Sequence, residues 1–164
     1  MLKPKIQDAL NGQLNAELAS SYLYLSMAAW FEAKNFRGMA RWMRTQSHEE
    51  WSHGMKFFDF IVSRGGRVSL AAVDAPKAEW ANVPEVFEDS YKHECKVTGL
   101  INGLMKLVET ESDFASRAFL EWFVTEQVEE ESQVELIVEK LKLMGESHVA
   151  LFLLDGELGK RAGG

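Results

Sequence analysis

The chain has 164 residues, of which 46% are hydrophobic and 26% charged, a balance typical of a folded domain rather than a disordered segment. Its formal net charge of −7 argues against sequence-independent binding to nucleic acid, because phosphate contacts need a basic surface. No stretch is apolar enough to cross a membrane, the opening MLKPKIQDALN contains no signal-peptide core, and the only cysteine is Cys95, so we expect a cytoplasmic protein.

Residues typical of helix starts and helix ends divide the chain into five predicted helices. Pro4 stands where the first turn of a helix tolerates proline. The pair Gly65-Gly66 is typical of a helix end. Asn82 with Pro84 indicates a new helix start after the only long irregular segment. The expected helices cover about 4–33, 36–64, 83–110, 113–144 and 147–158.

The lengths of the links between these helices predict the fold class. Short links join the first helix to the second and the third to the fourth, whereas a long link joins the two pairs. Two helical hairpins joined by one long crossover form a four-helix bundle. We therefore expect an all-α single domain over residues 1–164, with a short fifth helix at the C-terminus.

Each long helix carries an apolar seam, read at spacings of three and four residues, that is interrupted at its middle by polar groups. The interruptions repeat, because the polar positions of the first two helices recur 77 residues later in the third and fourth. Packing of the two hairpins about a pseudo-twofold axis would bring all of these groups to one level. They are Glu17, Glu50 and His53, followed by Glu94, Gln127 and Glu130.

Four converging carboxylates with one histidine predict a metal site. A single buried polar residue is often tolerated in a core, but several unpaired carboxylates would repel one another and lose hydration. Two divalent cations would balance the four charges. Oxygen ligands with one imidazole suit Fe(II), Mn(II) or Zn(II), and the lack of thiolate argues against a structural zinc site. The same cost argues against a bundle with a purely structural role.

A second acidic group flanks the first on the second and fourth helices. Glu49, Glu126 and Glu129 lie beside the core positions, and Glu126 again follows Glu49 by 77 residues. One interpretation is a solvated acidic face, which is common in a run such as EQVEEE. The other is a third, outer metal position.

These residues resemble the pattern of the non-haem ferritins, and the opening and the TEQVEEE run are most similar to the prokaryotic type. The resemblance covers the whole chain and implies a ferritin-like fold with a di-iron ferroxidase centre. It implies that Glu50 bridges the two irons. The first iron would be held by Glu17, Glu50 and His53, and the second by Glu50, Glu94 and Glu130.

The resemblance also assigns residues around the two irons. Gln127, counted with the metal-site residues, would hydrogen-bond solvent or dioxygen near the second iron, and Tyr24 would lie beside the centre. A third iron site would be formed by the outer glutamates, with one ligand shared with the second iron. Its residues would be Glu49, Glu126, Glu129 and Glu130.

The implied function is iron storage. The subunit would oxidise Fe(II) with dioxygen or hydrogen peroxide and deposit Fe(III) mineral inside a homo-oligomeric cage of 24 subunits, with no nucleic-acid or membrane partner. Haem is not expected, because Trp51 stands near the place of the family's haem-binding methionine. The alternative is a rubrerythrin-like or oxygenase-like redox enzyme, in which the iron stays bound as a cofactor. Such an enzyme would be expected to have a second histidine ligand or an electron-transfer domain.

Two further expectations concern residues outside the seams. The run VALFLL at 149–154 is apolar all round, which favours contact with other copies of the chain. Every candidate ligand precedes Gly145, so we expect the bundle and its metal site not to depend on this last segment. His48, His93 and His148 lie off the seams and are expected at the surface.

Overall fold

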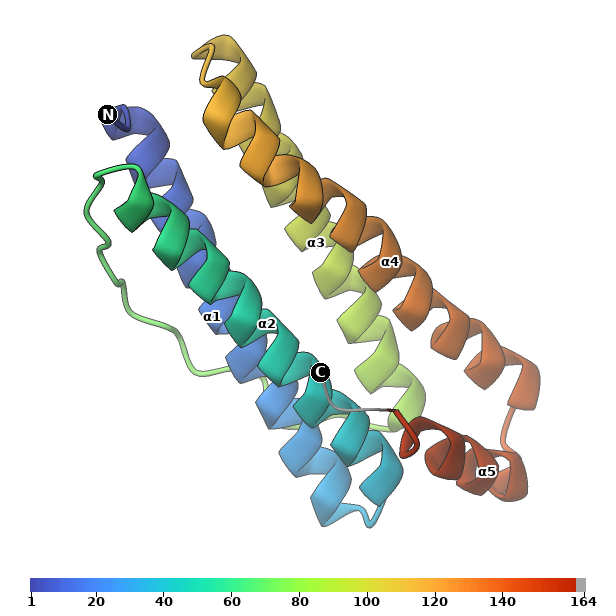
Figure 1. The fold of residues 1–164 in the computed structure, drawn as a ribbon. Coiled ribbons are helices and arrows are strands. Elements are labelled where there is room, and N and C mark those ends of the chain that lie inside the picture. Colours follow the sequence, from blue (N-terminus) through green and yellow to red (C-terminus); the bar gives the residue numbers. More distant parts are fainter. Residues whose placement is uncertain (162–164) are drawn as a thin grey trace.

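The computed structural model describes residues 1–161, and in this part of the chain two antiparallel helical hairpins lie side by side (Figure 1). The predicted all-α bundle is confirmed. The bounds of each predicted range agree with the observed helix to within one residue. Where they differ, the predicted range also includes the residue that caps the helix. None of the helices described is long and apolar enough to cross a membrane. The helices are α1 (Pro4–Ala33), α2 (Arg37–Ser63), α3 (Val83–Thr110), α4 (Phe114–Met144) and α5 (His148–Leu158).

Local sequence signals account for the helix starts. At α3 the side chain of Asn82 accepts a hydrogen bond from the Glu85 amide at 2.9 Å, and the Glu85 carboxylate accepts one from the Ala81 amide at 2.6 Å. These reciprocal bonds satisfy amides that have no partner within the helix. At α4 the carboxylate of Asp113 caps the Ser116 amide in the same way.

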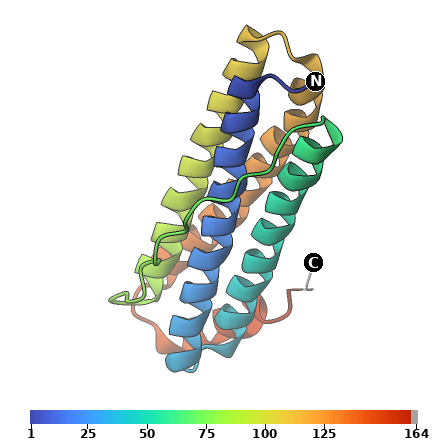
Figure 2. The same cartoon turned by 90° about the vertical axis from the view of Figure 1, so that its left-hand side faces the viewer.

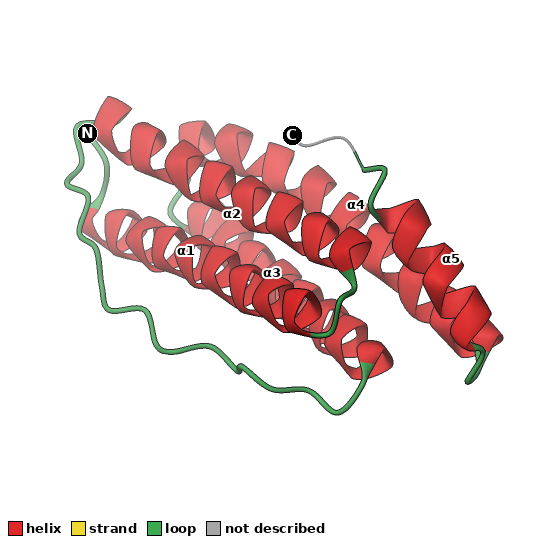
Figure 3. Cartoon of the chain, turned by 90° about the horizontal axis from the view of Figure 1, so that it is seen from below, coloured by secondary structure: helices red, strands yellow, loops and turns green. Residues whose placement is uncertain are grey.

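The long crossover, residues 64–82, runs along the outside of α1 (Figures 2 and 3). Asn11 anchors it, because its side-chain oxygen accepts from the Ser69 amide at 2.8 Å and its side-chain nitrogen donates to the Arg67 carbonyl at 3.0 Å. The crossover returns the chain to the end of the bundle at which α2 began. Helix α3 therefore runs parallel to α2, as a bundle with one long connection requires.

Helix α5 lies across one end of the bundle and is part of its core. Leu154 and Leu158 are buried in the same apolar cluster as residues of α1 to α4. Asp155 accepts a hydrogen bond from the Met39 amide at 2.9 Å and so caps the first turn of α2. A chain cut after Gly145 would lose these contacts, and the expectation that the bundle and its metal site do not depend on this segment stays a prediction. One side of the apolar run at 149–154 packs on the bundle of its own chain, and the other side faces outward.

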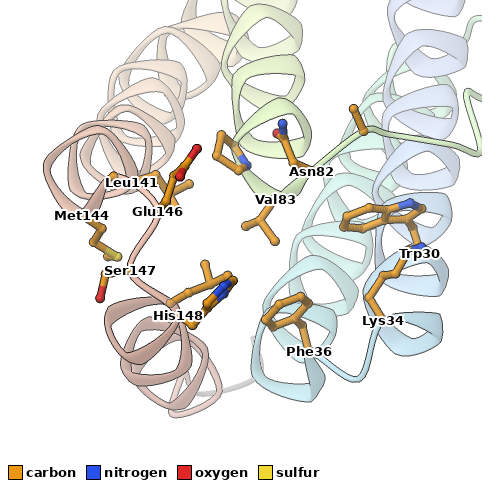
Figure 4. Close-up of a pocket in the computed structure, with 14 residues that line it drawn as sticks. Trp30, Lys34, Phe36, Asn82, Val83, Leu141, Met144, Glu146, Ser147 and His148 are labelled. Atoms are coloured by element: carbon orange, nitrogen blue, oxygen red, sulfur yellow. The ribbon is translucent and has the colours of Figure 1, made fainter.

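The outward side of α5 is strongly apolar. Val149, Phe152 and Leu153 are exposed. Next to α5, a pocket of about 600 Å³ is lined by side chains that include Trp30 and Leu151 (Figure 4). This pocket contains none of the glutamates of the predicted metal site.

The apolar core consists of two clusters, one toward each end of the bundle. The cluster near α5 includes Phe31 and Phe87, and the cluster at the other end includes Leu10 and Phe123. The polar positions of the four long helices lie between the two clusters. The bundle thus places a polar layer at mid-height with apolar residues on both sides.

Candidate metal centre

Six polar side chains are buried in the layer between the two apolar clusters. Each comes from the middle of a long helix, so the packing of helices rather than a loop fixes its position. The exposed fraction is 1% for each of Glu17, Glu50 and Glu94, 5% for His53, 4% for Gln127 and 2% for Glu130.

Two groups within this layer have the geometry of a metal site. In each group one nitrogen or oxygen atom from every residue lies within 4.8 Å of the others. Glu50 belongs to both groups, so two ions held there would share its carboxylate. The groups are Glu17, Glu50 and His53, and Glu50, Glu94 and Glu130.

Two carboxylate oxygens of the layer are buried without a hydrogen-bond partner among the described residues. They are Oε2 of Glu17 and Oε1 of Glu50. A buried polar atom without a partner costs about 1–3 kcal/mol, so such atoms are rare unless they bind something. A cation at this place would satisfy both oxygens. The residues present therefore fit a bound divalent metal.

Neutral amides hold other carboxylate oxygens in place. Gln13 donates to Glu17 Oε1 at 2.7 Å, and Gln46 donates to Glu130 Oε2 at 2.7 Å. Neither glutamine was predicted as part of the site. Each stands one helical turn before a seam glutamate, Gln13 before Glu17 and Gln46 before Glu50, and this spacing is the signal that could have found them.

Tyr24 and Gln127 both contact Glu94. The buried Tyr24 hydroxyl donates to Glu94 Oε1. The Gln127 amide donates to Glu94 Oε2 and to Thr98 Oγ1, each at 3.3 Å. Both residues thus lie beside the second carboxylate group, and together they fix the orientation of the Glu94 carboxylate.

Burial raises the pKa of all four glutamates of the layer. The pKa of Glu94 rises to about 7 and that of Glu130 to about 8. The pKa of Glu17 is also raised by burial, and that of Glu50 is raised by burial and by the negative charges around it. Without metal, the layer therefore holds protons at neutral pH, and a bound cation must displace them.

His53 is neutral at pH 7. Burial, together with the positive charge of Lys56, lowers its pKa to about 4. Its Nδ1 lies 3.4 Å from Glu50 Oε2, and its Nε2 lies 3.6 Å from Glu126 Oε1. The ring packs edge-on against Trp122. A neutral imidazole between two carboxylates has a lone pair available for a metal ion.

The outer glutamates, Glu49, Glu126 and Glu129, lie on the α2–α4 side of the centre. Burial raises the pKa of Glu126, and the negative charges of Glu129 and Glu49 raise it further. Of the three, only Glu126 belongs to a close ligand group in the described part of the chain, with His53 and Glu130. A pocket of about 400 Å³ borders this position.

One histidine lies deeper than the sequence predicted. His93 is half-buried, with Nε2 at 2.8 Å from Ser20 Oγ and its ring edge-on to Tyr24. Burial lowers its pKa to about 4. The prediction of a surface position was wrong, because α1 covers the side of α3 next to the seam as well as the seam itself.

The metal-free protein is expected to lose about 2 kcal/mol of stability between pH 6.5 and pH 8. The pKa values of Glu94 and Glu130, about 7 and 8, exceed the 4.5 of an unfolded glutamate. Between pH 6.5 and pH 8 the folded protein loses protons that the unfolded chain has already lost, so the free energy of unfolding falls as the pH rises. His53 and His93 have the opposite effect, mainly below their unfolded pKa of 6.5, and offset only part of this loss above it.

Urea unfolding of chelator-treated protein at several pH values measures this dependence. Glu130→Gln is expected to flatten it, because the amide does not titrate. Zn(II) is expected to stabilise the protein more at pH 8 than at pH 6.5. A metal-free protein whose stability rises over this range would contradict the assignment of buried, protonated carboxylates.

Comparisons with known proteins find relatives along nearly the whole chain. A family model described as a ferritin-like domain matches residues 7–144. The chain is 41% identical to a bacterial non-heme ferritin of Bacteroides fragilis (strain 638R), over 98% of this chain and 100% of that protein. It is 39% identical to a bacterial non-heme ferritin of Escherichia coli O157:H7, over 96% of each.

A solved structure is similar over the same length. The crystal structures of an open pore ferritin from the hyperthermophilic archaeon Archaeoglobus fulgidus include a chain with a TM-score of 0.98 and 49% identity. The match covers 99% of this chain and 100% of that one. The similarity thus includes α5 as well as the four long helices.

Proposed function

The chain belongs to the ferritin family, and from this premise we propose that it is an iron-storage subunit that oxidises Fe(II) at the buried centre. The Fe(III) product then passes into a mineral inside a cage built from copies of the chain. The observation that carries this proposal is the pair of ligand groups that share Glu50. Two Fe(II) ions held by one bridging carboxylate can be oxidised together, each giving up one electron.

We assign Glu17, Glu50 and His53 to the first iron and Glu50, Glu94 and Glu130 to the second. The spacing of their ligand atoms and the buried oxygens without partners support this assignment. The second position has oxygen ligands only. Without an imidazole there, Fe(III) is expected to stay exchangeable, which suits a storage protein better than an enzyme with fixed iron.

Tyr24 and Gln127 are assigned to positions beside the second iron. Their hydrogen bonds to Glu94 support a role in orienting that carboxylate. Burial and the surrounding carboxylates raise the pKa of Tyr24 well above its usual range, so its phenol stays protonated. The phenol can thus keep donating to Glu94 while the centre gains and loses metal.

The oxidant is dioxygen or hydrogen peroxide, each of which accepts the two electrons that a pair of Fe(II) ions supplies. Dioxygen yields hydrogen peroxide, and hydrogen peroxide yields water. We also assign a third iron position to Glu49, Glu126 and Glu129, with Glu130 shared. The closeness of Glu126 to His53 and Glu130, and the effect of the Glu129 and Glu49 charges on the pKa of Glu126, support this assignment.

The assembly that we propose is a cage of 24 subunits. The exposed side of α5, Val149, Phe152 and Leu153, is an apolar surface that subunit contacts would cover. Closed symmetry lets one such surface serve every copy. Our expected location is the cytoplasm, because the exposed, free Cys95 suits a reducing compartment.

Native mass measured before and after loading with Fe(II) in air tests the function. Twenty-four chains of 18.6 kDa give roughly 450 kDa, and we expect hundreds of irons to be retained by each particle. A small oligomer that keeps only two irons per chain would instead favour a redox enzyme with fixed iron. That alternative is not favoured by the relatives, which are non-haem ferritins.

A further inference from the structure

Arg161, just after α5, lies against the outer side of the metal centre. Its backbone amide donates to the Leu158 carbonyl at 3.2 Å, which continues the end of α5. Its guanidinium reaches α2, where Nη2 donates to Glu49 Oε2 at 2.6 Å. The guanidinium carbon lies 4.8 Å from the centre of the Trp42 ring, and the Arg161 side chain is only 18% exposed.

These contacts hold the positively charged guanidinium of Arg161 in one position. Trp42 is buried and so offers a rigid aromatic face, on which a guanidinium can stack. Glu49 supplies the negative charge beside it. An ion pair that is stacked and mostly buried is screened less by water than an exposed one. Arg161 is therefore held in place rather than free in solvent.

The Glu49 carboxylate is engaged by Arg161 through the hydrogen bond to its Oε2. Its negative charge still acts on Glu126 and Glu130. Among the described residues, however, the close group at this place contains His53, Glu126 and Glu130 without Glu49. The guanidinium thus engages one of the carboxylates that a third cation would need.

We propose that Arg161 sets the metal affinity of the outer position by acting as a built-in cation that holds Glu49. This inference rests on the proposed function, because it takes the outer glutamates as the third iron position. A divalent ion that binds there must displace the guanidinium from Glu49 and is repelled by its charge until it does. The outer position should therefore fill only after the two inner ones.

Zn(II) titration of the metal-free, assembled protein tests the inference, with calorimetry as the readout and no oxidation involved. The wild type is expected to show two tight sites per chain and a third, weaker one. In Arg161→Gln the third site should tighten about tenfold, because Glu49 becomes available and the repulsion is gone. The affinities of the two inner sites should stay within about twofold.

Lys160→Gln is the matched control, because it removes one positive charge from an exposed neighbour in the same segment. It should leave all three affinities unchanged. In a Glu49→Gln background, Arg161→Gln should tighten the third site much less than it does in the wild type, since the carboxylate that Arg161 holds is absent and only the charge repulsion is removed. Arg161→Lys, which keeps the charge but loses the planar stack, should tighten the site less than Arg161→Gln.

The possible failures are distinguishable. If the two inner sites of Arg161→Gln are tight but its third site is unchanged or weakened, the inference about Arg161 is overturned and the proposed function is not. A weakened third site would show that Arg161 only supports the local structure. A wild type without a pair of tight sites overturns the proposed function instead. If Arg161→Gln does not assemble, the comparison of Arg161→Lys with the wild type decides, and an unchanged third site there overturns the inference.

Discussion

Glu50→Ala is expected to lower the initial rate of Fe(II) oxidation at least 100-fold while the bundle remains folded. Glu50 is the residue shared by both inner ligand groups, so its loss removes a ligand from both ions at once. Replacing a residue that only orients a metal ligand already costs about 10–100-fold in affinity or activity, and a bridging ligand should cost more.

The fold should tolerate this change. Burial and three neighbouring carboxylates raise the pKa of Glu50, so its removal relieves repulsion that the metal-free layer otherwise bears. Glu50→Gln keeps the volume of the side chain and should lose activity in the same way. Circular dichroism and native mass should match those of the wild type for both variants.

Stopped-flow absorbance at two Fe(II) per chain measures the rate. Glu135→Ala is a suitable control, because it removes an exposed glutamate of α4 that lies outside every ligand group of the described residues. The control should oxidise iron at the wild-type rate. A wild-type initial rate in Glu50→Ala would rule out the shared carboxylate as part of the centre.

Gly38→Ala should destabilise the protein by about 3 kcal/mol, a cost in the range for overpacking a tight contact. A methyl group at Gly38 would lie 1.8 Å from the Asp155 carbonyl oxygen, so α5 would have to move away. That movement would break the Asp155 cap on the Met39 amide and expose Leu154. The substitution should also disturb the cage, because it displaces the apolar surface of α5.

Urea unfolding and light scattering test this expectation. Gly12→Ala is the control, since a methyl group there meets nothing within 4 Å and α1 should gain up to about 1 kcal/mol from alanine. Wild-type stability and particle mass in Gly38→Ala would mean that α5 can shift without cost. Its docking on α2 would then be unimportant for both the fold and the assembly.

The helices and the composition of the polar layer could be predicted from the sequence, because both are encoded locally. Helix starts and ends follow from residues such as Asn82 and Gly65, which act on their own neighbours in the chain. Side chains three and four residues apart share a helix face, so the seams identified Glu50 and His53 as inward-facing. The 77-residue repeat then indicated that two hairpins meet at one level.

Only the tertiary structure decided which atoms meet across helices. Gln46 donates to Glu130, which is 84 residues away, and Arg161 reaches Glu49 across 112 residues. No helical period relates such positions, because the contacts depend on how far each helix is shifted and turned against its neighbour. For the same reason the surface position predicted for His93 was wrong. The sequence also could not show that Leu154 of α5 is buried in the core of the bundle.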